Sequence, residues 1–112
     1  MVNSKSKGKR GELELALELE RLLRIEARRG QQFSGSTDSP DIVHSIAGIH
    51  IECKRTEALR LAQAMQQAID DAGDKVPVVM HRASRQPWMV SLRLDDLPLF
   101  VTQVYLTMVE NQ

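Results

Sequence analysis

The chain has 112 residues, of which 42% are hydrophobic and 27% are charged, and its formal net charge at pH 7 is zero. This length allows a single domain, residues 1–112, and the composition is typical of a soluble globular protein. No run approaches the ~20 apolar residues that a membrane helix needs, so we expect no membrane association. A single cysteine excludes an internal disulfide and suits a reducing, cytoplasmic compartment. The balanced net charge does not by itself indicate nucleic-acid binding. Any evidence for such binding must come from the local distribution of charge.

The N-terminal quarter joins a basic segment to an amphipathic one. Residues 1–10 hold three lysines, one arginine and no acid. We expect residues 1–8 to be a flexible basic arm that either contacts a phosphate backbone or only aids solubility. Leucines at helical spacing predict a helix over residues 9–29, with Gly30 as its C-cap. Glu12 falls on the apolar stripe, where a carboxylate needs a partner or a metal, unless it is one of the acids that first turns commonly carry.

The centre of the chain predicts two short strands behind a polar link. The link, residues 31–38, is rich in glycine and hydroxyl side chains, and its Ser34 and Ser36 can donate to a phosphate or only shape a turn. Residues 39–55 then indicate a hairpin, with an Ala-Gly turn between the strands. Asp41 opens the first strand, so a hairpin brings it beside the second.

The second strand, residues 49–54, sets an apolar face against a face that bears His50, Glu52 and Lys54. With Asp41, this face gathers two carboxylates and an ammonium. Oxygen ligands favour Mg²⁺ or Mn²⁺, which can polarise a scissile phosphate while the lysine orients water or neutralises charge. The alternative is an edge strand with a solvated face. The histidines of the two strands have no zinc spacing with the lone cysteine, and we take them as strand residues at solvent or groove edges.

The C-terminal half predicts two strands between two helices. Residues 58–72 form an amphipathic helix with glutamines on its polar side, and residues 76–82 form a strand buried on both faces. Residues 87–94 form another strand, with Trp88 expected in the core. For the apolar residues 100–109 we favour a helix, which is a candidate dimer surface unless it only completes the monomer core.

The P-D pair ending at Asp41 and the E-C-K triplet starting at Glu52 resemble the PD-(D/E)xK nuclease superfamily. Within it, the chain is similar to archaeal-type Holliday junction resolvases and their small phage relatives over about residues 7–93. The likeness includes Glu12, four residues after the glycine of a Lys-Gly pair, with Glu14 as the competing choice. It implies an α/β fold with a restriction-endonuclease-like core, in which helices flank a mixed central β-sheet of four to five strands.

The resemblance also implies a site and its partners. Glu12, Asp41 and Glu52 would hold Mg²⁺ or Mn²⁺ with the backbone carbonyl of Cys53, and Lys54 would assist the attacking water. The three acids and the lysine are therefore the expected catalytic residues. The expected partner is DNA, branched by analogy with the resolvases, bound by a homodimer in a bacterial or phage-infected cell. The residues expected to contact DNA, from local positive charge or from the resemblance, are Lys7, Lys9, Arg10, Ser34, Arg55, Gln67, Arg82 and Arg85.

We therefore expect a metal-dependent DNA endonuclease that hydrolyses phosphodiester bonds and selects DNA by its structure. Fold and site do not fix the substrate, and two other functions fit the sequence. One is a DNA-binding protein on the same scaffold that does not cut, which a cleavage assay with Mg²⁺ or Mn²⁺ distinguishes. The other is a structural or assembly protein of a phage particle, which would ignore DNA in a gel shift at low salt.

Overall fold

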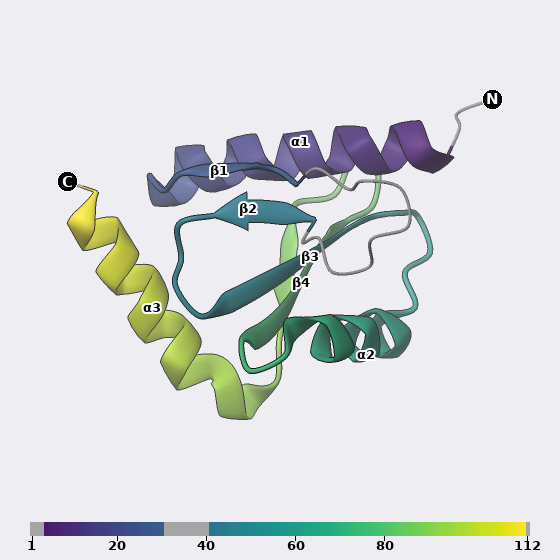
Figure 1. Ribbon diagram of the computed structural model, residues 1–112. Helices are drawn as coiled ribbons and strands as arrows, with labels where there is room; N and C mark the ends of the chain where they lie inside the picture. Colours follow the sequence, from purple (N-terminus) through teal and green to yellow (C-terminus); the bar gives the residue numbers. More distant parts are fainter. Residues whose placement is uncertain (1–3, 31–40, 112) are drawn as a thin grey trace.

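The computed structural model describes residues 4–30 and 41–111 (Figure 1). Within them the fold is α/β, and the predicted helices and strands occur in the predicted order, with one additional short strand after the first helix. Ser34, Ser36, residues 1–3 and the side chain of Lys7 lie outside this described part. The elements are α1 (Ser4–Leu23), β1 (Ala27–Arg29), β2 (Ile42–His44), β3 (Ile49–Arg55), α2 (Leu61–Ala72), β4 (Val76–Arg82), β5 (Met89–Ser91), the 3₁₀ turn η1 (Leu94–Asp96) and α3 (Leu97–Glu110).

Helix α1 begins earlier than predicted and also ends earlier. Its start at Ser4 makes most of the expected flexible arm helical, because lysine and arginine are good helix formers and no proline interrupts them. Leu15 and Leu19 are buried at helical spacing, as predicted. The helix stops where Arg24 adopts a left-handed φ of 55°. Beyond it, buried and exposed residues alternate, which is the strand pattern of β1, so the prediction of a helix up to Gly30 is wrong.

The five strands form two sheets. Strands β1 and β2 pair antiparallel, with Ala27 opposite His44. Strand β3 pairs in parallel with β4, with Glu52 opposite Val79, and β4 pairs antiparallel with β5. The predicted hairpin ladder between β2 and β3 is wrong, because β1 pairs with β2 and no ladder joins β2 to β3 among the strands described. The two strands still lie side by side, which brings Asp41 to β3 (Figure 1).

Helices α1 and α2 lie on either side of the strands (Figure 1). The main core lies between α1 and the strands and includes Leu15, Ile42 and Ile51. A smaller core between α2 and β4 is built on Ala68 and Val79, and the small alanine lets α2 approach the sheet closely. Strand β4 is buried on both faces, as predicted. Strand β3 therefore lies between the main core on the α1 side and the smaller core on the α2 side.

The C-terminal residues confirm the predicted helix. Phe100, Val104 and Met108, spaced four residues apart, pack against the main core, as does Trp88. Strand β5 is shorter than the predicted 87–94. None of the helices in residues 4–30 and 41–111 is long and apolar enough to cross a membrane. Much of α3 and η1 stays exposed, including Leu94, Leu97, Leu99, Val101, Tyr105, Leu106 and Val109.

Candidate active site

Strand β3 directs two side chains of the predicted site toward α2. Ile51 and Cys53 pack against the main core, so Glu52 and Lys54, which alternate with them, point to the other face. Glu52 is buried, with 3% of its surface exposed. The Nζ atom of Lys54 donates to Oε1 of Gln67 on α2 at 2.8 Å. The two faces of this strand are therefore those predicted from the sequence.

Asp41 lies at the edge of β3 that does not pair with β4. Its Oδ2 accepts a hydrogen bond from the backbone N–H of Cys53 at 2.9 Å. The other edge of β3 faces β4, where the N–H of Thr56 donates to the carbonyl of Arg82 at 3.1 Å. In an extended strand the N–H and C=O of one residue point to the same edge, so the carbonyl of Cys53 also opens toward Asp41. The carboxylate and this carbonyl thus share one edge of the strand that carries Glu52.

Glu12 reaches the same place from α1. Its Oε2 is buried and has no hydrogen-bond partner among the residues described. Burial raises the pKa of Glu12 to about 7, and the negative charges of Asp41 and Glu52 act in the same direction against the cations Arg29 and Lys9. The charges of Asp41 and Glu52 thus act on Glu12, so the three predicted acids lie in one region, although their ligand atoms are not all within 4.8 Å of one another.

Two further polar residues surround Glu52. The Nε2 atom of His50 lies 2.8 Å from Oε1 of Glu52, and the Asp71 carboxylate on α2 also contacts Glu52. Burial raises the pKa of Glu52, the hydrogen bond from His50 lowers it, and Asp41 and Asp71 raise it further. His50 is buried, with 8% of its surface exposed, so the expectation of a solvent edge is wrong, although His50 does line a pocket beside Lys75. The sequence held a signal for Asp71, which is four residues after Gln67 and so on the same side of α2.

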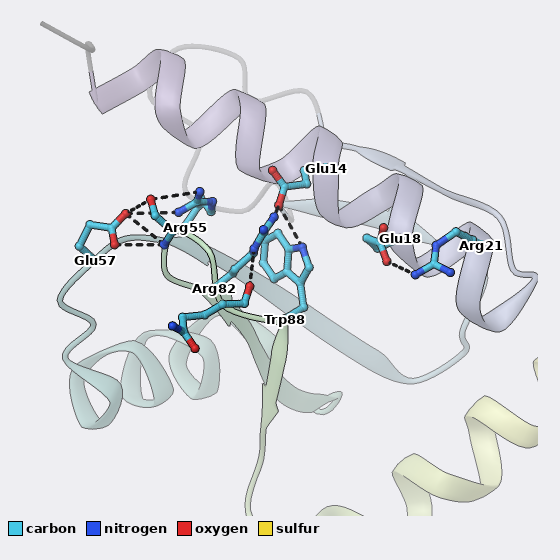
Figure 2. A network of polar contacts seen from close by, with 9 residues as sticks. Glu14, Glu18, Arg21, Arg55, Glu57, Arg82 and Trp88 are labelled. Carbon is cyan, nitrogen blue, oxygen red and sulfur yellow. Dashed lines mark hydrogen bonds and ion pairs between the residues drawn. The ribbon is translucent and has the colours of Figure 1, made fainter.

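A second polar network lies beside the site and involves two arginines expected to contact DNA (Figure 2). Arg82 forms an ion pair with Glu14, whose Oε1 also accepts a hydrogen bond from Nε1 of Trp88 at 3.2 Å. Arg55 lies 3.6 Å from the carboxylate of Glu57. Both arginines therefore have acidic partners within the chain. Glu14, the competing choice for the helix acid, binds this network instead.

Other residues expected to contact DNA are free to face solvent. Lys9 and Arg10 are exposed on the first half of α1, in the same stretch as Glu12, and Arg85 is exposed at the turn after β4. Helix α1 meets β3 at Gly11, where a Cβ atom would lie 2.6 Å from the Cβ of Arg55. The absence of a side chain at this glycine lets the helix approach the strand and carries Glu12 to its edge.

The comparisons with known proteins agree with this geometry. Neither a protein-family model nor a curated protein matches the sequence. Among solved structures, one match is Hjc of Archaeoglobus fulgidus, a Holliday junction resolvase from an archaeal hyperthermophile. The chain has the fold of this resolvase. The match covers 78% of this chain and 73% of the resolvase, with 26% sequence identity and a TM-score of 0.56.

This match confirms the resemblance drawn from the motifs and the α/β fold class. The resolvase-like fold here consists of a mixed three-stranded sheet, a two-stranded sheet and three helices within the described residues.

Proposed function

We propose that the protein is a metal-dependent endonuclease that hydrolyses phosphodiester bonds in branched DNA. The observation that carries the proposal is that Glu12 is acted on by the charges of Asp41 and Glu52, on and beside the strand that bears Lys54, within a resolvase-like fold. Three acids drawn from separate elements would repel one another without a cation. The match to a Holliday junction resolvase supports DNA as the substrate and a branched structure as its selective feature.

The donor set suits Mg²⁺ or Mn²⁺. Carboxylate and carbonyl oxygens are the ligands that these hard cations prefer, and Glu12 keeps a buried oxygen without a hydrogen-bond partner in the part of the chain that is described. Glu12, Asp41 and Glu52 would hold the ion with the carbonyl of Cys53. When bound, such an ion supplies positive charge to the phosphoryl oxygens and acidity to a nearby water.

Lys54 acts beside this cluster. Its ammonium lies at the same strand end as the acids, and Gln67 restrains its position through the 2.8 Å hydrogen bond. A fixed ammonium can orient the attacking water and neutralise charge that develops on the phosphate. Gln67 is thus a positioning residue, because it acts through Lys54.

DNA contacts are proposed for the basic residues around the site. Lys9 and Arg10 are exposed and can neutralise phosphates directly. Arg55 and Arg82 already have acidic partners, so they would contribute less unless DNA replaces those partners. Lys7, Ser34, Gln67 and Arg85 complete the proposed set.

We further propose a homodimer that presents two such sites to a branched substrate. The exposed apolar residues of η1 and α3 are the candidate contact, since obligate dimer interfaces are richer in apolar side chains than ordinary surface. A second copy is the occupant that also supplies the second active site needed to cut two strands of one junction. Light scattering measures this directly, and a strictly monomeric protein would contradict it.

The decisive experiment offers the purified chain labelled four-way junctions, flaps, nicked duplex and plain duplex with Mg²⁺ or Mn²⁺. Cleavage of the junction, its loss on chelation and its loss in Asp41→Asn with binding preserved would support the proposal. The asparagine keeps an oxygen for the Cys53 N–H, so that variant tests the charge alone. Binding without cleavage under all conditions would favour a non-catalytic DNA-binding protein. No gel shift at low salt would favour a phage structural or assembly protein.

A further inference from the structure

The face of β3 that meets α2 carries a second group of metal-ligand side chains. His50, Glu52 and Asp71 each offer one ligand atom, and these atoms all lie within 4.8 Å of one another. His50 and Glu52 are buried, with 8% and 3% exposed, whereas Asp71 is exposed on the last turn of α2. Of these three residues, the proposed nuclease mechanism uses Glu52 alone.

The separation of the three atoms is close to what one cation requires. Ions of this kind bind oxygen and nitrogen at about 2.1 Å, so two ligands on opposite sides of an ion lie about 4.2 Å apart. Neighbouring ligands lie nearer, and Nε2 of His50 is already 2.8 Å from Oε1 of Glu52. Asp71 is exposed and its carboxylate already lies within 4.8 Å of both other ligand atoms, so a small side-chain movement completes the set.

His50 and Asp71 lie on one side of Glu52, and Asp41 and Glu12 lie on the other. Asp41 lies at the edge of β3 that does not pair with β4 and Glu12 comes from α1, whereas His50 and Asp71 lie under and on α2. One carboxylate has two oxygens, so Glu52 can serve both groups. A carboxylate shared by two cations is the arrangement of two-metal phosphoryl-transfer sites, whose ions lie about 3.5–4 Å apart.

We propose that His50, Glu52 and Asp71 form a second divalent-cation site, which shares Glu52 with the site of Glu12 and Asp41. This inference rests on the proposed nuclease function for the first site. An imidazole ligand favours transition ions over Mg²⁺, so the second site takes Mn²⁺ more readily than Mg²⁺. A second cation beside the first would stabilise the leaving oxygen during phosphodiester hydrolysis.

The test counts Mn²⁺ ions bound to the full chain without DNA, by calorimetry and by the electron paramagnetic resonance signal of free Mn²⁺. The wild type is expected to bind two ions. Asp71→Asn and His50→Gln should each retain one and weaken the other at least about tenfold. Asp41→Asn should instead lose the ion of the first site and keep the ion of the second. Asp70→Asn is the matched control, because Asp70 is also on α2 but bonds to Gln66.

The outcomes separate the two proposals. One Mn²⁺ on the wild type that Asp71→Asn leaves in place, or Asp71→Asn binding that equals the wild type, overturns the second site, even if the protein cuts DNA. Two ions with the predicted losses support it, even if no DNA is cut and the nuclease proposal fails. Asp71 is exposed, so its variant reports on binding even if the buried His50→Gln variant fails to fold.

Discussion

Replacing Glu12 with glutamine should stabilise the metal-free protein at alkaline pH while it removes activity. The Glu12 carboxylate is partly buried and feels the negative charges of Asp41 and Glu52, and its pKa of about 7 lies well above the ordinary 4.5. The folded state therefore holds a proton that the unfolded chain releases between pH 4.5 and 7. The free energy of unfolding therefore falls as the pH rises through this window. Above pH 7 the whole destabilisation by the ionised Glu12 is present.

The size of the effect follows from the same values. A pKa raised from 4.5 to about 7 corresponds to about 3.4 kcal/mol. Solvent reaches part of the Glu12 side chain, and screening reduces this to about 1–2 kcal/mol. For a chain of this length that is a rise in Tm of about 4–8 °C for Glu12→Gln at pH 8.

The assay is thermal unfolding of wild type and Glu12→Gln in EDTA at pH 5 and pH 8, repeated with Mn²⁺. The variant should gain stability over the wild type at pH 8 and not at pH 5. Mn²⁺ should stabilise the wild type more than the variant, because a cation offsets the ionised acids. Equal Tm differences at both pH values would refute a raised pKa at Glu12. Glu14→Gln, which removes the partner of Arg82 instead, is the control that should not gain stability at pH 8.

Three other changes test separate features. Gln67→Ala should lower the cleavage rate about tenfold without changing Mn²⁺ binding, because it releases Lys54, and Gln66→Ala, on the same helix, should cleave at the wild-type rate. Gly11→Ala should cost about 1–3 kcal/mol of stability by denaturant unfolding, because its Cβ would lie 2.6 Å from a β3 side chain; Gly8→Ala, where nothing lies within 4 Å, should be neutral or stabilising. Val101→Glu, at a position 55% exposed, should abolish the dimer in light scattering without lowering Tm, and an unchanged mass would exclude α3 from the interface.

The candidate site was largely predictable because its residues follow local rules. Strand alternation alone separates Glu52 and Lys54 from the core residues between them. The position of Glu12 on the leucine stripe follows from helical spacing. Neither rule places Asp41 beside the strand of Glu52. The predicted hairpin placed it there, but through a β2–β3 ladder that the described strands do not form.

The errors arose where tertiary partners decide the structure. The segment after Arg24 contains residues that form helices well, yet it pairs with β2, and this pairing outweighs local propensity. His50 appeared to be an edge residue because strand alternation shows which face it occupies but not which helix covers that face. Asp71 was not among the expected site residues, since its position near Glu52 depends on how α2 lies across the sheet.

The contact between Asp41 and the Cys53 N–H satisfies a backbone group at the edge of β3 that does not pair with β4. The exposed margin of a sheet offers unpaired backbone groups to any extended peptide and is a common starting point for aggregation. Here the Asp41 side chain accepts the hydrogen bond of one such group, on the strand that bears the proposed catalytic residues. Removal of that side chain would leave the Cys53 N–H without this acceptor, so a loss of cleavage in an alanine variant would need to be separated from a loss of solubility.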